Sequence, residues 1–263
     1  MRPFVLLLSS ALFSAAHAQA QSEIRIGSAS PLSGPGAHLG KDIENGARMA
    51  VDDLNAKGVT IGGRKVKWVL QAEDDGSDPK AGTAVAQKLV DAGVAAVVGH
   101  LNSGTTVPAS KLYASAGIPQ ISPAATTPLY TQQGYKTAFR VVANDKLIGR
   151  ALARQAIGTL KARKIAVIDD RTAFGERYRQ RYGYPLQTYA PYAYDAVMVF
   201  AAAMQQAQSG APAGFLPALA KIRHAGITGP IAFDGKGDLR DAALTLYTYR
   251  QGRKTKLQVL RAQ

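Results

Sequence analysis

Apolar and polar positions predict alternating strands and helices along the first half of the chain. Short apolar runs are separated by longer segments in which apolar residues recur at helical spacing. Asp78 followed by Pro79 indicates a helix N-cap with proline at the first helical position. This order predicts a parallel sheet with helices on both faces. The predicted strands are residues 23–27, 66–72, 94–98 and 118–121, and the predicted helices are residues 40–56, 79–92 and 105–116.

The second half of the chain has a less regular pattern. Where a further crossover helix is needed, the charged and aromatic residues 176–182 give only about two turns. A second lobe built from this half is therefore expected to have one parallel strand and a terminal hairpin, which cannot bury both faces of a sheet. The predicted strands are residues 137–142, 164–169 and 229–233 and a hairpin over 244–259 with its turn at 250–253, and the predicted helices are residues 145–160, 190–208 and 215–224.

Two loops rich in small residues and hydroxyl groups form the candidate site. Residues 99–106 follow one predicted buried strand, and residues 122–128 follow the next. Open α/β sheets bind ligands beyond the carboxyl ends of their parallel strands. Free amides and hydroxyls in such loops suit a small anionic group such as a carboxylate. The sequence therefore favours a binding protein over an enzyme.

The first twenty residues have the pattern of a targeting segment. Arg2 gives a positive start, residues 4–13 are mostly apolar, and residues 16–18 have the small-x-small form that signal peptidase cuts. The apolar run is too short to anchor the chain in a bilayer. We therefore predict a signal peptide over residues 1–20, cleaved after Ala18 or Ala20, and an exported, soluble mature chain.

Charge and chemistry-bearing residues narrow the function further. The net charge is +14, but the basic residues are spread out without an aromatic-interleaved stripe, so no nucleic-acid partner is predicted. There is no cysteine, and no metal-binding spacing, phosphate loop or nucleophile elbow. We therefore expect no catalytic residues, metal or cofactor. His100 is expected to be a structural histidine, and Asp74 and Asp75 are expected to stabilise a loop.

Further motifs run in a consistent order through nearly all of the chain. They are Ile26-Gly27 to Ser33-Gly34-Pro35, Asp74-Asp75 with Asp78-Pro79-Lys80, residues 99–110, residues 122–126, residues 165–170 with Phe174-Gly175, residues 188–196, and Phe233-Asp234 with Gly237-Asp238-Leu239. In these motifs and in their order, the chain resembles the periplasmic Leu/Ile/Val-binding proteins, which deliver amino acids to ABC transporters. The resemblance implies a type I periplasmic-binding α/β fold with two Rossmann-like lobes and parallel sheets. It also implies a monomer that captures a branched-chain or related aliphatic amino acid for a membrane permease.

The resemblance implies roles for four residues of the two loops. Ser103 and Thr126 would hydrogen-bond the α-carboxylate of the amino acid together with nearby backbone amides. The carbonyl groups of Leu101 and Ala124 would hold its ammonium group. A zwitterion needs donors at one end and acceptors at the other, which fits this division. From the residues alone, the two hydroxyls can also be helix caps or turn hydroxyls.

Two further residues match apolar positions around the ligand. Leu39 would form an aliphatic wall where relatives often carry an aromatic residue. Phe174 would lie over the ligand from the second lobe. An ordinary loop leucine and a core phenylalanine are the alternatives at these two positions.

A long stretch of the family pattern is absent between Gly175 and Glu176. This stretch supplies most of the second lobe in the family, including an acid that pairs with the ligand's ammonium group. We therefore expect an internal deletion, a truncated second lobe and weak or no binding of amino acids. A one-lobed natural relative, a sensor or regulator of amino acids or amides, and a non-binding remnant are the alternatives. The expected division is a first lobe of residues 23–142 with 184–236, and a second-lobe remnant of residues 143–183 with 237–263.

Overall fold

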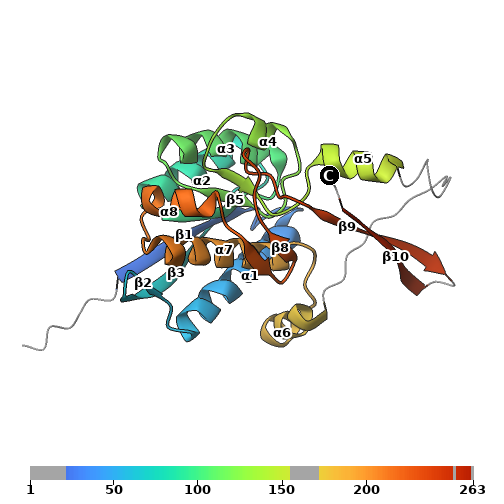
Figure 1. The fold of residues 1–263 in the computed structure, drawn as a ribbon, viewed down its shortest axis with the longest axis horizontal. Helices are drawn as coiled ribbons and strands as arrows, with labels where there is room; N and C mark the ends of the chain where they lie inside the picture. The colour runs from blue at the N-terminus through green and yellow to red at the C-terminus, as the bar shows by residue number, and fades with distance from the viewer. Residues whose placement is uncertain (1–21, 155–171, 251–252, 262–263) are drawn as a thin grey trace, which may run out of the picture.

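The computed structural model describes residues 22–154, 172–250 and 253–261. A sheet with the strand order β2-β3-β1-β4-β5-β6 lies at its centre (Figure 1). Parallel pairing runs from β3 through β1, β4 and β5 to β6, whereas β2 is antiparallel to β3. The carboxyl ends of the five parallel strands therefore meet at one edge. The strands are β1 (Ser22–Ser30), β2 (Thr60–Ile61), β3 (Arg64–Asp74), β4 (Ala96–Gly99), β5 (Gln120–Ser122) and β6 (Ala138–Arg140).

Helices cover both faces of this sheet (Figure 1). One face packs against α2 and α3, with α4 beside α3, and the other packs against α1, α7 and α8. Val97 belongs to the core under α2 and α3, and its neighbour Val98 belongs to the core under α1 and α7. Successive residues of a strand point to opposite faces, so a continuously apolar strand needs both layers. The helices are α1 (Ala37–Ala56), α2 (Pro79–Asp91), α3 (Ser103–Ser115), α4 (Leu129–Gln132), α7 (Ala190–Ala207) and α8 (Pro212–Leu219).

The strand and helix order predicted for the first half is confirmed. β2 was not predicted, because a two-residue strand leaves no periodic signal. The predicted helix over residues 215–224 is too long: α8 ends at Leu219, and His224 begins β7 (His224–Gly226). β7 pairs with β8 (Gly229–Ile231), so its backbone bonds to a strand instead of continuing the helix. The predicted signal peptide, the strand over residues 164–169 and the end of the helix over 145–160 lie outside the described residues.

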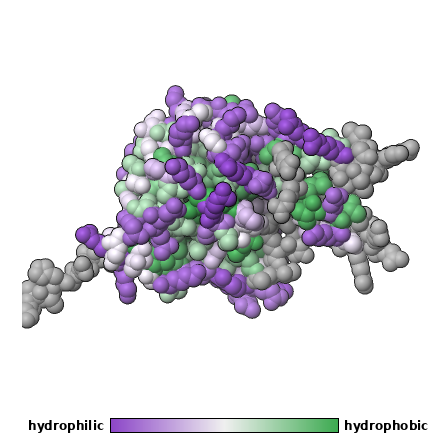
Figure 2. Space-filling view, viewed as in Figure 1, coloured by the Kyte–Doolittle hydropathy of each residue, from purple (hydrophilic) through white to green (hydrophobic). Residues whose placement is uncertain are grey.

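Two elements extend away from the layered body (Figure 1). They are α5 (Asp145–Ala153), which has no buried residue, and the hairpin of β9 (Ala243–Arg250) and β10 (Arg253–Arg261). This hairpin was predicted. Its strand β10 exposes Leu257 and Val259, and Figure 2 shows hydrophobic surface in this part of the molecule.

Helix α6 (Thr172–Tyr182) packs against α1, although the sequence places it with the second-lobe remnant. The Asn45 side-chain amide donates hydrogen bonds to the hydroxyls of Tyr178 and Tyr184 at 2.8 and 2.9 Å. Arg177 forms an ion pair with Asp53 at 2.8 Å. These contacts attach α6 to α1.

Asp42 and Gly46 of α1 hold α7 in place. Asp42 does so through its buried carboxylate, and Gly46 because it has no side chain to separate the helices. Asp42 is 1% exposed and accepts hydrogen bonds from the four amides of residues 187–190 at 2.6–2.9 Å. These amides lead into α7, so Asp42 caps that helix from a distant part of the chain. A Cβ atom at Gly46 would lie 2.1 Å from the carbonyl oxygen of Ala190. Glycine is therefore required where the two helices meet.

A second buried aspartate attaches the β7–β8 hairpin to α7. Asp195 accepts hydrogen bonds from the amides of Ile227 and Thr228 at 2.9 and 2.8 Å. Burial raises the pKa of Asp195, although hydrogen bonds from Thr228 and Ile227 oppose this shift. Burial lowers the pKa of His224 on the same hairpin, and the charge of Asp195 opposes the change.

The Asp42 cap is expected to be a major source of stability. Asp42→Ala leaves four amide groups without their acceptor and should lower the free energy of unfolding by about 3 kcal/mol. Asp52→Ala on the same helix removes only an exposed ion pair with Arg181 and should change it by less than about 0.5 kcal/mol. Urea denaturation followed by circular dichroism measures both, and equal effects would contradict the role of Asp42.

The contact between α1 and α7 is tested by two glycine substitutions. Gly46→Ala forces a methyl group against backbone and should destabilise the protein by about 2 kcal/mol. Gly149→Ala in α5 meets no atom within 4 Å and should stabilise the protein by roughly 0.5–1 kcal/mol through helix propensity. Thermal and urea unfolding of the two variants should therefore shift in opposite directions.

The lowered pKa of His224 predicts a pH-dependent contribution to stability. The neutral imidazole stabilises the fold above the ordinary pKa, about 6.5, and this stabilisation is lost as pH falls through that value towards the lower folded pKa. The free energy of unfolding of His224→Gln should therefore fall less between pH 7 and pH 5 than that of the unmodified chain. His38→Gln, at an exposed position, should keep the original slope.

Candidate functional site

The order of the sheet reverses between β1 and β4, at the carboxyl edge. The chain leaves these two strands into α1 on one face and α3 on the other. Open α/β sheets bind ligands at such switch points. Leu39 lies in the first turn of α1, and Leu101 and Ser103 follow β4. Three of the six predicted residues therefore come from the elements that flank the switch point.

The two predicted loops lie side by side at this edge. Ser103 is half-buried at the start of α3, and its hydroxyl oxygen accepts a hydrogen bond from the amide of Thr127 at 3.4 Å. Thr127 directly follows Thr126, which is also half-buried. The fold thus brings Ser103 next to the loop that carries Thr126, because β4 and β5 are parallel neighbours.

Ser122 determines which backbone groups of its loop are available. Its hydroxyl oxygen accepts hydrogen bonds from the amides of Ala124 and Ala125 at 3.3 and 2.8 Å and donates one to the carbonyl of His100 at 3.0 Å. These two amides are therefore engaged within the protein and do not add to a carboxylate site. The carbonyl groups of Leu101 and Ala124 make no hydrogen bond within the described part of the chain. Both can therefore accept one from a ligand.

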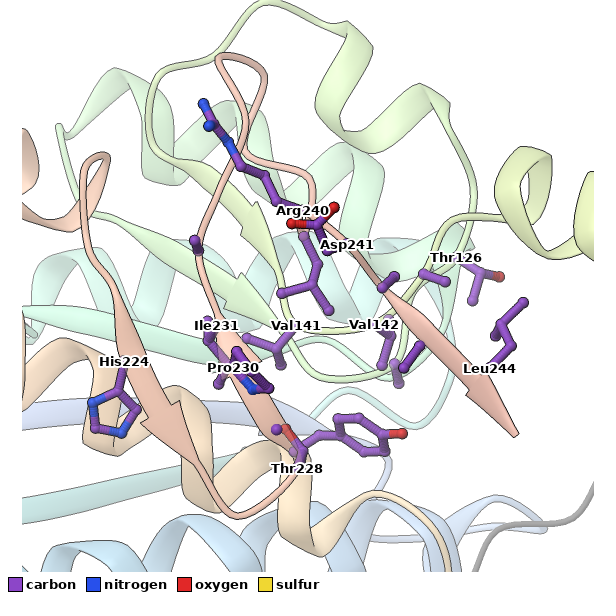
Figure 3. Close-up of a pocket in the computed structure, with 18 of the residues that line it drawn as sticks. Thr126, Val141, Val142, His224, Thr228, Pro230, Ile231, Arg240, Asp241 and Leu244 are labelled. Atoms are coloured by element: carbon purple, nitrogen blue, oxygen red, sulfur yellow. The ribbon is translucent and has the colours of Figure 1, made fainter. Parts of the chain in front are cut away.

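A cavity of about 830 Å³ opens beside the second loop (Figure 3). Ala124 and Thr126 line it, whereas Leu39, Leu101, Ser103 and Phe174 do not. Most of the wall comes from segments distant in sequence: the end of β6, the start of α7, the β7–β8 hairpin and residues 239–244. Two of the six predicted residues therefore line this cavity, and the other four lie outside its wall.

The wall of the cavity is largely apolar, with a few ionisable groups. Its apolar members include Val141, Val142, Ile148, Ile231 and Leu244, with Tyr189 and Tyr192 beside them, and its ionisable members are Arg223, His224, Arg240 and Asp241. Sequence reasoning did not name these residues as binding residues. Tyr189 and Tyr192 belong to the 188–196 motif, which carried the family resemblance. That these residues line one cavity follows from the tertiary packing and not from the motif. Asp241 supplies a carboxylate to this wall.

Phe174 belongs to α6 and lies in the hydrophobic core between that helix and α7. It is buried, and its ring makes an edge contact with Tyr194 at 5.3 Å between centroids and lies 6.5 Å from Tyr178. Its described surroundings are those of a core phenylalanine, the alternative that the sequence left open. Leu39 is half-buried and packs on the main core at the start of α1.

The interpretation of His100, Asp74 and Asp75 as structural residues is confirmed. The buried ring of His100 hydrogen-bonds Asp75 at 2.7 Å and the hydroxyl of Tyr113 at 3.2 Å. Burial raises the pKa of Tyr113 well above its ordinary value. Asp74 accepts hydrogen bonds from the amides of Leu32 and Gly76. These groups are satisfied within the loops.

The described residues offer neither a metal site nor a membrane-spanning helix. Among them, no group of three or more His, Cys, Asp or Glu side chains is arranged to hold a metal ion. No helix in the same part of the chain has the length and hydrophobicity needed to cross a membrane.

Comparisons with known proteins agree with this architecture. The model of the periplasmic binding protein family matches residues 23–182. Leu/Ile/Val-binding protein homolog 1 of Brucella abortus is 41% identical over 157 residues, which are 60% of this chain and 42% of that protein. The leucine-specific-binding protein of Salmonella typhimurium is 42% identical over 154 residues, or 59% and 41% of the two chains. The match thus spans less than half the length of these relatives.

Solved structures show the same fold. The branched-chain amino acid transporter substrate-binding protein LivJ of Streptococcus pneumoniae, in complex with isoleucine, superposes with a TM-score of 0.78 at 20% identity over 91% of this chain and 100% of that chain. An ABC transporter substrate-binding protein of Desulfitobacterium hafniense, in complex with Leu, gives a TM-score of 0.73 at 25% identity over 90% and 100%.

These similarities confirm the expected type I periplasmic-binding α/β fold. They also confirm the resemblance drawn from the sequence motifs. The matching family consists of periplasmic solute-binding proteins, which are not enzymes. The chain therefore belongs to the periplasmic binding protein family.

Proposed function

We propose that this chain binds an aliphatic amino acid at the carboxyl edge of its sheet and serves an ABC transporter in the periplasm. The observation that carries the proposal is that hydroxyl donors and carbonyl acceptors available to a ligand lie in the same two loops at this edge. The hydroxyls of Ser103 and Thr126 belong to adjoining loops. The carbonyls of Leu101 and Ala124, which accept no hydrogen bond from the described residues, stand in the same loops. This set suits the two charged ends of an amino acid.

The apolar cavity supports an aliphatic side chain on the ligand. Thr126 and Ala124 border it, and Val141, Val142 and Ile231 form part of its wall. Ligand sites usually combine such apolar walls with a few directed polar groups. The names of the relatives point the same way, because they include Leu/Ile/Val-binding and leucine-specific-binding proteins.

Binding is proposed to be weak because the second lobe is incomplete. The sequence passes from Gly175 directly to Glu176, and the match covers less than half of the curated relatives. In the described chain, α5 buries no residue, and the β9–β10 hairpin is a separate two-stranded sheet. A ligand held from one side keeps more contact with water and loses charge-assisted partners. We therefore retain the proposal of an internal deletion.

The remaining parts of the proposal follow from the sequence pattern. A signal peptide over residues 1–20 would export the chain, and the permease of an ABC transporter would be its membrane partner. The bound form would be a monomer. The first lobe would comprise residues 23–142 and 184–236, with α6 added by its contacts with α1.

Weak binding is measurable by nuclear magnetic resonance. Titration with L-leucine should move the amide signals of the 100–106 and 122–128 loops with a dissociation constant near about 1 mM. Thr126→Val and Ser103→Ala remove a hydroxyl donor and should each weaken binding about tenfold. Ser115→Ala, at the exposed far end of α3, should leave it unchanged.

Three outcomes would contradict parts of this proposal. Micromolar affinity would contradict the impairment attributed to the missing lobe. No saturable change up to about 50 mM leucine, far above the proposed dissociation constant, would contradict amino-acid capture. A non-cooperative thermal transition would instead support a non-binding remnant.

A further inference from the structure

Arg140, the last residue of β6, carries a fully buried guanidinium group. Its side chain is 0% exposed. Burying a cation is unfavourable unless it is paired and its donors are satisfied. The buried charge of Arg140 therefore requires hydrogen-bond acceptors and an anionic partner from the segments around it.

Arg140 holds the backbone on both sides of Thr126. Its Nη1 donates to the carbonyl of Ala125 at 2.7 Å, and its Nη2 donates to the carbonyl of Thr127 at 2.8 Å. The same Nη2 lies 3.0 Å from the hydroxyl of Thr131. A planar guanidinium offers its donors in a rigid fork. The orientation of the peptide units that flank Thr126 is therefore set by one side chain.

Asp238 completes the pairing from a distant segment. Its Oδ1 lies 2.6 Å from Nε of Arg140 and also accepts a hydrogen bond from the Thr131 hydroxyl at 2.9 Å. Its Oδ2 accepts one from the side-chain amide of Asn144 at 3.1 Å. The ion pair thus joins the 123–131 loop, the end of β6 and the segment around Asp238.

The segment Phe233–Leu239 forms a turn that places Asp238 beside Arg140. Oδ1 of Asp234 accepts hydrogen bonds from the amides of Lys236 and Asp238 at 2.8 and 2.9 Å. Gly237 has φ +92°, and a Cβ atom there would lie 1.9 Å from the carbonyl oxygen of Ala138. Glycine therefore lets the turn lie directly against β6 and place Asp238 beside Arg140.

The network also includes the chain that leaves β6 towards α5. Asn144 caps α5 through Oδ1, which accepts a hydrogen bond from the amide of Leu147 at 3.0 Å, while its Nδ2 bonds Asp238. The amide of Asp145 donates to the carbonyl of Thr126 at 2.9 Å. The carbonyl of Thr126 is thus bonded directly to the segment that leads to α5. Its neighbours Ala125 and Thr127 are joined through Arg140 and Asp238 to the segment that leads to the β9–β10 hairpin.

We propose that Arg140 and Asp238 are positioning residues for the candidate binding loop. Their ion pair holds Thr126 in place and ties the loop to the segments that lead to α5 and to the β9–β10 hairpin. The ligand part of this inference rests on the proposed function. The positioning of the loop does not, because it can be measured without a ligand.

Hydrogen exchange of the whole chain tests the positioning directly. Arg140→Lys keeps the charge but loses the fork, so amides of residues 122–131 should exchange at least about tenfold faster. Amides of α2, on the far side of α3, should keep their rates. Arg177→Lys alters another arginine–aspartate pair, on α6, and should leave the 122–131 loop unchanged.

A second variant keeps the test valid if Arg140→Lys does not fold. Thr131→Val removes the hydroxyl that contacts both Arg140 and Asp238 and keeps both charges. It should also accelerate exchange in the loop and not in α2. Unchanged loop exchange in the folded variants, or equal acceleration in α2, would overturn the proposal.

Leucine titration separates this proposal from the proposed function. If the unmodified chain binds leucine, Arg140→Lys should raise the dissociation constant about tenfold, and equal affinity would overturn the positioning role. If the unmodified chain does not bind leucine but loop exchange rises in Arg140→Lys, amino-acid capture fails and the positioning role is supported.

Discussion

The four hydrogen bonds that Asp42 accepts from residues 187–190 are the interaction on which the layered fold depends. They bring a helix from the second half of the chain onto the first half, with Gly46 allowing close contact. Without α7, part of the apolar face that includes Val98 would lose its cover, because α1 and α8 alone would remain on it. A parallel sheet is stable only when both faces are covered. The carboxyl edge can therefore present its loops only because α7 is held in place.

The candidate site combines polar groups from the sheet with a wall built by distant segments. Its polar groups follow β4 and β5, while α5, which has no buried residue, and the β9–β10 hairpin extend away from the layered body. The cavity beside Thr126 is walled mainly by the start of α7, the β7–β8 hairpin and residues 239–244. Directed polar groups and an apolar wall therefore lie side by side, as they do in most ligand sites.

Local sequence signals predicted the first half of the chain well because its elements are regular. Asp78 with Pro79 marked the start of α2, and the strand ends located both candidate loops. The second half was harder. The end of α8 was placed too late, since the pairing of His224 with Ile231 depends on a neighbouring strand. Phe174 matched a motif, but its environment in the core depends on α6 packing against α1.

By itself, the sequence determined the alternation of strands and helices, the family and the two hydroxyl-bearing loops, because these are properties of short segments. Tertiary structure alone decided which groups in those loops are free. The Ser122 hydroxyl donates to the carbonyl of His100, and Arg140 engages the carbonyls of Ala125 and Thr127. Hydrogen bonds such as these join residues that are distant in the chain or turned towards each other only in the fold. No local pattern of residues specifies them, because they follow from how the layers pack.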